Sequence, residues 1–182
     1  NMDRMFRGAS VFNQDIGKWN VNQVTDMVGM FNYAKSFNQD IGNWDVSKVN
    51  NMSSMFNNAT LFNQDIGNWD VSNVAVMSGM FYFAISFNQD LTSWDVSKVE
   101  SLSGMFYNAN AFNQDIGKWN VWNVKSVDKM FKNAIKFNAN LTRWNMANVR
   151  FDPSKPSPCY EFNYNTPNWV SGQLPTFNSC NI

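Results

Sequence analysis

Hydrophobic positions recur along the chain with a 25-residue period, and polar positions recur between them in the same register. One unit reads F-N-Q-D-I-G-x-W-(D/N)-V-x-x-V-x-x-M-x-x-M-F-x-x-A-x-x, and no insertion or deletion interrupts its copies. A single coil cannot bury its apolar face alone, so a gap-free period of this length predicts a solenoid in which coils stack and like side chains meet. The Phe-Asn-Gln-Asp string of each unit begins at Phe12, Phe37, Phe62, Phe87 and Phe112, and a weaker copy, Phe-Asn-Ala-Asn, begins at Phe137.

Two spacings within a unit predict its secondary structure. Trp69 and Val71 lie two residues apart, as in a strand, and we expect a short parallel strand at roughly residues 67–71. The apolar residues from Val74 to Ala84 follow the spacing i, i+3, i+6, i+7, i+10, which favours a short helix or 3₁₀ turn with one buried face. The sequence therefore predicts an α/β repeat solenoid: a right-handed, leucine-rich-repeat-like coil with one short parallel strand and one short helix or 3₁₀ turn per 25-residue repeat.

Two further columns are predicted to be structural. The Trp column is preceded by Ile or Leu and followed by Val or Met in every unit, which favours a place in the core over the alternative, a row of rings that stack on sugars. The Asn column has no exception, and we expect a buried stack whose amides bond from coil to coil, because an amide both donates and accepts. These columns are Trp19, Trp44, Trp69, Trp94, Trp119 and Trp144, and Asn13, Asn38, Asn63, Asn88, Asn113 and Asn138.

A column of aspartates carries the main candidates for chemistry. The functional interpretations are a row of calcium sites or a paired-carboxylate hydrolase. The structural alternative is that each carboxylate accepts backbone N–H groups in an Asx turn. We prefer the Asx-turn interpretation, because Asn140 occupies the same position of the last unit and keeps the side-chain acceptor without the charge. We therefore predict no catalytic residue, no cofactor and no metal, with weak metal candidates at Asp15, Asp40, Asp65, Asp90 and Asp115.

Charge and composition argue against several classes of protein. The 14 basic and 14 acidic side chains cancel, whereas a nucleic-acid binder needs a basic surface. The chain has no histidine, and so lacks the commonest general base and transition-metal ligand. No stretch approaches the roughly 18 apolar residues of a membrane helix.

The two ends of the chain differ from the regular units. The predicted solenoid covers residues 1–150. Its first unit is incomplete, because Met2 aligns with Met27 in the middle of the repeat. We expect further repeats, another domain or a partner chain before it, because a solenoid needs caps at its ends. Residues 151–182 contain all five prolines and are predicted to form a Pro-rich cap, since proline cannot donate to the next rung.

Covalent modifications are predicted from two patterns. Cys159 and Cys180 both lie in the cap and favour one disulfide over free thiols, which implies an extracellular or other oxidising compartment. A zinc site would need more ligands than two cysteines supply. The sequons at Asn51, Asn58 and Asn140 are candidates for N-glycosylation.

Positions that vary between units are the candidates for partner contacts. Trp122 interrupts a column of small polar residues. Tyr33, Tyr82, Phe83 and Tyr107 follow the Met-Phe pairs, where aromatic side chains on an exposed face are typical of hot spots. The alternative is that Tyr33 and Phe83 fold over the edge of the core.

The unit MFxxAxxFNQDIGxWDVSxVxxM, over residues 2–149, resembles the BspA-like 25-residue repeats of surface proteins and Mycoplasma-type lipoproteins. The resemblance implies a leucine-rich-repeat-like fold, surface display, adhesion or protein binding, and no catalytic residues. We therefore expect a non-enzymatic interaction or adhesion module at the cell surface that binds a protein or a glycan. The alternative is a structural subunit or spacer of a larger assembly, docked through its open N-terminal coil.

Overall fold

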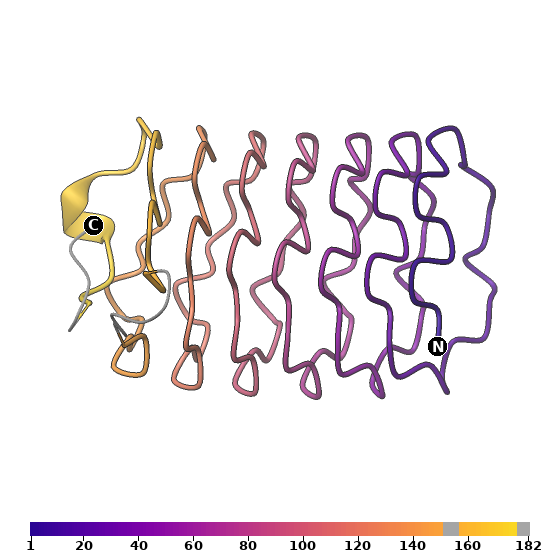
Figure 1. Cartoon of the computed structure of the whole chain (residues 1–182), viewed down its shortest axis with the longest axis horizontal. Helices are drawn as coiled ribbons and strands as arrows, with labels where there is room; N and C mark the ends of the chain where they lie inside the picture. The colour runs from indigo at the N-terminus through magenta and orange to yellow at the C-terminus, as the bar shows by residue number, and fades with distance from the viewer. Residues whose placement is uncertain (151–156, 178–182) are drawn as a thin grey trace.

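The chain forms a row of coils that lie side by side along one axis, with its first residues and the last described ones at opposite ends of the row (Figure 1). This computed structural model describes residues 1–150 and 157–177. Backbone N–H groups of one coil donate to carbonyls of the next coil, as from Met27 to Asn51 at 3.1 Å and from Phe31 to Met55 at 2.9 Å. Both bonds span the same number of positions, so successive 25-residue units are stacked in register.

The predicted α/β architecture of strands and helices is wrong. Within residues 1–150 and 157–177, the only helix is the 3₁₀ helix η1 (Ser171–Gln173), and no strand is longer than a single bridging residue. The leucine-rich-repeat-like coil with a strand and a helix in each repeat is therefore corrected to a coil built from turns. Its isolated parallel bridges join Asp26 to Asn51, Asn51 to Val76, Val76 to Ser101, Ser101 to Ser126, and Asn145 to Thr176.

The segment predicted as a strand, residues 67–71, is replaced by local turns. The N–H of Trp69 donates to the carbonyl of Ile66 at 3.1 Å, and the N–H of Val74 donates to that of Val71 at 2.9 Å. These donors are satisfied within the coil and are not available to a neighbouring strand. Trp69 and Val71 still both face the core, because successive turns, rather than a pleat, direct them inward.

The segment predicted as a helix, residues 74–84, alternates between two kinds of hydrogen bond. Met80 donates to Met77 at 3.2 Å within the coil, whereas the intervening Gly79 donates to Ser103 of the next coil at 2.8 Å. Gly79 has a φ of 63° and Phe83 a φ of 55°, and this left-handed backbone interrupts a right-handed helix. A positive φ at the third residue of a turn is the type II signature. The three-residue spacing thus reflects consecutive β-turns.

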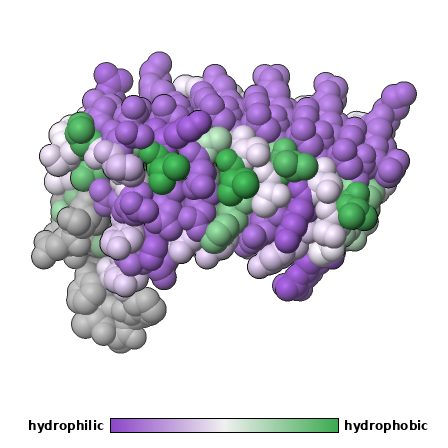
Figure 2. Space-filling model, turned by 90° about the horizontal axis from the view of Figure 1, so that it is seen from above, coloured by the Kyte–Doolittle hydropathy of each residue, from purple (hydrophilic) through white to green (hydrophobic). Residues whose placement is uncertain are grey.

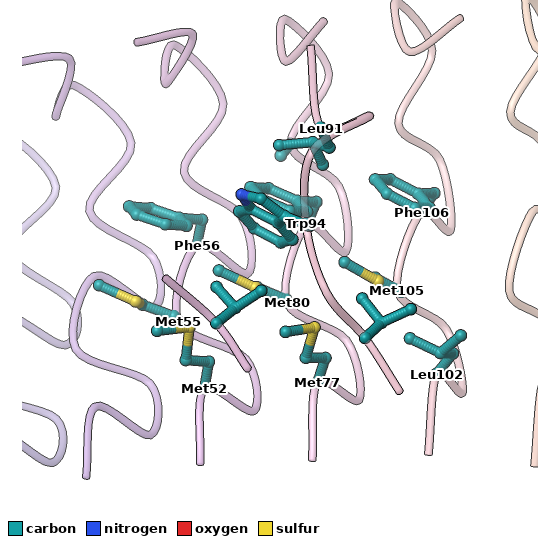
Figure 3. Packing of buried hydrophobic residues seen from close by; sticks show 14 of the residues in the cluster. Met52, Met55, Phe56, Met77, Met80, Leu91, Trp94, Leu102, Met105 and Phe106 are labelled. Carbon is teal, nitrogen blue, oxygen red and sulfur yellow. The ribbon is translucent and has the colours of Figure 1, made fainter. Parts of the chain in front are cut away.

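The core consists of columns of identical side chains. The rings of Phe31 and Phe37 stack 3.9 Å apart within one coil, and Phe31 stacks on Phe56 of the next at 5.6 Å. Figure 3 shows the same arrangement around Trp94, with methionines of neighbouring coils below the rings. Each fully buried aromatic side chain contributes roughly 1.5–3 kcal/mol. The columns form one continuous apolar cluster along the stack.

Residues 158–169 add one more, degenerate coil that sequence analysis did not find. The N–H of Phe131 donates to the carbonyl of Phe162 at 2.8 Å, as each Phe of its column does to the following coil. This acceptor lies seven positions further along the chain than the regular repeat would place it, so a seven-residue insertion shifts the register without ending the stack. Trp169 occupies the place of a core Phe and meets Phe137 edge to face at 4.8 Å.

The predicted Pro-rich cap over residues 151–182 is described only in part. Its first residues, 151–156, and its last, 178–182, lie outside the described residues. The described part between them stacks on the regular coils, as the degenerate coil. A separate cap with a boundary at residue 151 therefore stays a prediction.

Candidate binding surface

A row of three tyrosines and one lysine crosses four successive coils at a single position of the repeat. We call Tyr82, Tyr107, Lys132 and Tyr164 the aromatic row. The rings of Tyr82 and Tyr107 stack with centroids 4.5 Å apart and planes 18° apart. The Nζ atom of Lys132 then lies 5.8 Å from the Tyr107 ring and 5.0 Å from the Tyr164 ring. Cation–π attraction thus links the rings on either side of the lysine.

An ion pair holds the lysine of the aromatic row in place. The Nζ atom of Lys132 lies 2.5 Å from a carboxylate oxygen of Glu161, and both side chains are about four-fifths covered. The hydrogen bond to Glu161 raises the pKa of Lys132, so the ammonium stays charged. The pair joins the regular coils to the degenerate coil and holds the Lys132 ammonium beside the Tyr107 and Tyr164 rings.

Phe83 packs beside the aromatic row. Its ring centroid lies 5.0 Å from that of Tyr82 and 5.5 Å from that of Tyr107. Phe83 is half-buried, and these contacts are with surface rings. The side chain therefore widens the exposed aromatic surface.

A shallow depression of about 380 Å³ lies beside Tyr82. Four of its lining residues carry hydroxyl groups, and two of these hydroxyls belong to short hydrogen bonds: Ser78 Oγ to Ser101 Oγ, and Ser103 Oγ to Ser126 Oγ, each at 2.7 Å. Burial raises the pKa of the Asp128 carboxyl, and burial likewise raises the pKa of the Tyr82 phenol. The lining residues are Ser54, Asn57, Ser78, Gly79, Tyr82, Ser103, Gly104, Asp128 and Lys129.

The other predicted partner residues lie apart from this surface. Trp122 is 48% exposed, but it makes no ring contact with the aromatic row among the described residues. Tyr33 is 49% exposed, and the coil that carries Asn58 separates it from Phe83. Figure 2 shows that, on the face it presents, hydrophobic side chains are separated by hydrophilic ones. The structure thus stacks Tyr82 on Tyr107, leaves Trp122 apart, and places Tyr33 without a ring contact but near enough to help raise the pKa of Tyr82.

The predicted Asp column takes part in local turns. Asp40 Oδ1 accepts the backbone N–H of Gly42 at 2.9 Å, and Asp15, Asp65, Asp90 and Asp115 accept the N–H two residues ahead in the same way. The Asx-turn interpretation is confirmed. An added Cβ at Gly42 would lie 2.6 Å from the carbonyl oxygen of Asp65, whereas the same position of other coils holds Thr92 and Thr142, so the neighbouring backbone is spaced differently there. Among the described residues, no group of three carboxylate or thiol side chains could hold a metal ion.

The Asn column forms the predicted ladder between coils. The side-chain oxygen of Asn38 accepts the backbone N–H of Asn63 at 2.9 Å, and the same bond recurs from Asn13 to Asn138. The expected burial is wrong, because these side chains are half-buried or exposed. The Trp column is in the core from Trp44 onward, while Trp19 is 40% exposed.

The candidate glycosylation asparagines and disulfide cysteines differ in their burial and surroundings. The amide nitrogen of Asn58 donates to Asn57 at 2.6 Å, and Asn51 is half-buried, whereas Asn140 is exposed. Cys159 is buried, but Cys180 lies outside the described residues, so their disulfide stays a prediction.

Sequence reasoning missed half of the aromatic row, Lys132 and Tyr164, together with Glu161. The missed signal is the spacing of the core residues from Cys159 onward, which equals the spacing from Met52 onward. The seven-residue insertion before Cys159 hides this match from a search for an uninterrupted 25-residue period. The matched positions are Cys159, Phe162, Thr166 and Trp169 against Met52, Met55, Ala59 and Phe62.

Comparison with known proteins gives one family. The family model described as "Mycoplasma protein of unknown function, DUF285" matches residues 1–84 and, overlapping them, residues 60–169. No curated protein and no solved structure matches the chain. Among the described residues, no helix has the length and hydrophobicity that a bilayer crossing requires.

Proposed function

The chain belongs to the DUF285 family of Mycoplasma proteins of unknown function, and we propose that it is a non-enzymatic binding module displayed at a cell surface. The resemblance of its 25-residue unit to BspA-like repeats of surface proteins supports the display. Adhesion through the outer face of the coils is the role that we assign to it.

The observation that carries this proposal is the stack of Tyr82 on Tyr107 at 4.5 Å, outside the core. The stacked rings of the regular core columns are buried, whereas these two rings are half-buried at the surface. Tyrosine gives a large contact area with few rotatable bonds, so little conformational entropy is lost on binding. The Lys132–Glu161 pair restrains the same row further.

The absence of enzyme activity is proposed on the repeated geometry. Acid–base catalysis by two carboxylates needs two unlike environments. Asp40 and Asp65 occupy equivalent Asx turns, each accepting from a glycine N–H at 2.9 Å. Equivalent turns give no division into acid and base.

The test is adhesion of the purified chain to cultured epithelial cells, measured by flow cytometry. We expect the double variant Tyr82→Ala/Tyr107→Ala to lose most of the bound signal. Trp122→Ala is the matched control, since it removes a surface aromatic side chain elsewhere on the stack, and we expect it to bind as the parent does. Equal loss in both variants, or no binding by the parent chain, contradicts the proposal.

A further inference from the structure

The depression beside Tyr82 arises from a step in one column of the repeat. The position held by Tyr82 and Tyr107 is held by the shorter Asn57 in the coil before them. Tyr107 covers one face of the Tyr82 ring at 4.5 Å. Tyr82 and Asn57 both line the depression, so the ring borders a space that a third tyrosine would have filled.

Two glycines, Gly79 and Gly104, line this space and place no side chain in it. An added Cβ at Gly104 would lie 3.4 Å from the Tyr82 ring, and one at Gly79 would lie 3.5 Å from Ser54 Oγ. Both glycines have positive φ, but non-glycine residues adopt the same backbone elsewhere in this column, as Lys129 does at a φ of 53°. Among the described coils, the two glycines and the exposed face of Tyr82 therefore line the same depression.

The polar groups around the ring are mostly uncharged. Ser54, Ser78 and Asn57 supply hydroxyl and amide groups. The two charged lining residues, Asp128 and Lys129, lie 4.0 Å apart and compensate each other. The volume of about 380 Å³ falls within the range of roughly 300–1,000 Å³ that small-molecule sites occupy.

We propose that this depression binds a neutral saccharide, with one sugar ring stacked on Tyr82 and its hydroxyl groups bonded to Ser54, Ser78 and Asn57. A sugar ring presents an apolar C–H face and a rim of hydroxyl groups, which match an aromatic wall within a hydroxyl and amide lining. An anionic ligand would meet no uncompensated positive charge there. The inference rests on the proposed function and specifies its ligand class.

The direct test uses a panel of immobilised saccharides: neutral galactose-terminated, glucose-terminated and N-acetylglucosamine-terminated oligosaccharides, a sialylated oligosaccharide and heparin. We expect the parent chain to bind at least one neutral member and to bind it more tightly than the sialylated oligosaccharide or heparin. Tyr82→Phe keeps the ring and should lose less affinity than Tyr82→Ala. Tyr82→Ala should weaken it about tenfold, the loss expected when one aromatic anchor is removed.

A second variant tests the space and not the ring. Gly104→Lys introduces the residue that Lys129 places at the same position of the next coil, so the backbone accommodates it. We expect it to weaken saccharide binding about tenfold by filling the depression, while strain at its positive φ lowers the thermal midpoint without unfolding the chain at the assay temperature. Binding of no neutral saccharide, preference for the anionic members, or parent-like binding by Tyr82→Ala and Gly104→Lys overturns the inference.

A last comparison separates this inference from the proposed function. Epithelial cells are treated with glycosidases that remove neutral and sialylated chains, and adhesion of the parent chain and of Tyr82→Ala is measured again. Loss of parent binding after treatment supports a saccharide ligand. Undiminished parent binding that Tyr82→Ala still abolishes keeps the binding module and overturns the saccharide.

Discussion

The indole nitrogen of Trp69 donates a hydrogen bond to the backbone carbonyl of Ile41, 28 residues earlier, at 3.1 Å. Both residues are buried, and the carbonyl oxygen of Ile41 also accepts the backbone N–H of Trp44 at 3.1 Å, so the indole supplies its second hydrogen bond. The same bond recurs in the other coils from Trp44 onward and ties each Trp to the coil before it. The equivalent donors and acceptors are Trp44 and Ile16, Trp94 and Ile66, Trp119 and Leu91, and Trp144 and Ile116.

Replacing Trp69 by Phe should therefore lower the free energy of unfolding by more than the smaller side chain alone would. The buried carbonyl of Ile41 would keep the backbone N–H of Trp44 but lose the indole donor, and one such hydrogen bond contributes about 0.5–1.5 kcal/mol. Urea denaturation followed by circular dichroism measures the change in free energy of unfolding. Trp19→Phe is the control, because Trp19 is 40% exposed, and we expect a smaller effect. Equal losses at the two positions would show that the hydrogen bond contributes nothing.

This column also shows how far sequence reasoning reaches. The 25-residue period places like residues on neighbouring coils, so the stacking of Phe31 on Phe56 and the core position of Trp69 follow from the register alone. The hydrogen bond of the indole does not, because a recurring Trp is equally compatible with packing alone. Register is thus predictable, while the partners of polar atoms depend on turn geometry.

The type of element was not predictable from apolar spacing, because three-residue steps fit both a helix and consecutive β-turns. The informative signal lies in the polar positions between them. Gly79, Gly104, Asn108 and Asn133 all adopt positive φ, and both residue types are favoured there. In the aromatic row, variability identified Tyr82 and Tyr107, but an unrecognised insertion concealed their lysine and tyrosine neighbours.

A β-branched residue at one of these left-handed positions should destabilise the coil. Gly79→Val places two methyl groups on a backbone with a φ of 63°, and we expect a loss of about 1–2 kcal/mol. Differential scanning calorimetry measures it as a lower thermal midpoint. Asn43→Val serves as the control, because Asn43 is exposed and does not adopt positive φ. If Gly79→Val and Asn43→Val have the same thermal midpoint, the position of Gly79 tolerates a β-branched side chain and the assignment of a left-handed turn there is wrong.

The Asx turns give the protein a defined response to acid. Hydrogen bonds from Ser47 lower the pKa of Asp45, and those from Thr92 and Ser97 lower the pKa of Asp90 and Asp95 below the ordinary 3.8. A carboxyl with a lowered folded pKa stabilises the fold above its unfolded pKa, and this stabilisation is lost as pH falls through the folded pKa. We therefore expect the thermal midpoint to be level above about pH 5 and to fall below pH 3.8.

A variant isolates these three carboxylates. Asn140, at the position of Asp90, accepts the backbone N–H of Thr142 at 3.0 Å, and Asn145, at the position of Asp45 and Asp95, accepts that of Ala147 at 3.1 Å. Uncharged amides thus form the same turns, so Asp45→Asn/Asp90→Asn/Asp95→Asn should keep its turns at neutral pH. Its thermal midpoint should fall less between about pH 5 and about pH 3 than that of the parent chain. An unchanged acid profile would assign the transition to other carboxyl groups.

The Lys132–Glu161 pair should stabilise the aromatic row more than an ordinary surface pair stabilises its surroundings. The chain contains a control: Lys125 and Glu100 lie 2.7 Å apart, but their side chains are 64% and 55% exposed, against 18% and 20% for Lys132 and Glu161. Exposed pairs contribute little, because solvent screens the charges and the side chains lose rotamer freedom. Double-mutant cycles with Lys→Met and Glu→Gln at both pairs measure each coupling.

We expect a larger coupling energy at Lys132–Glu161, and we expect Lys132→Met to weaken adhesion even though it leaves both neighbouring rings intact. The reason is positional: the ammonium lies 5.8 Å from Tyr107 and 5.0 Å from Tyr164, so its loss frees both rings to adopt other rotamers. Lys132→Arg keeps the charge above the rings and should restore adhesion. Equal coupling at the two pairs, with full adhesion by Lys132→Met, would mean that the rings hold their positions without the cation.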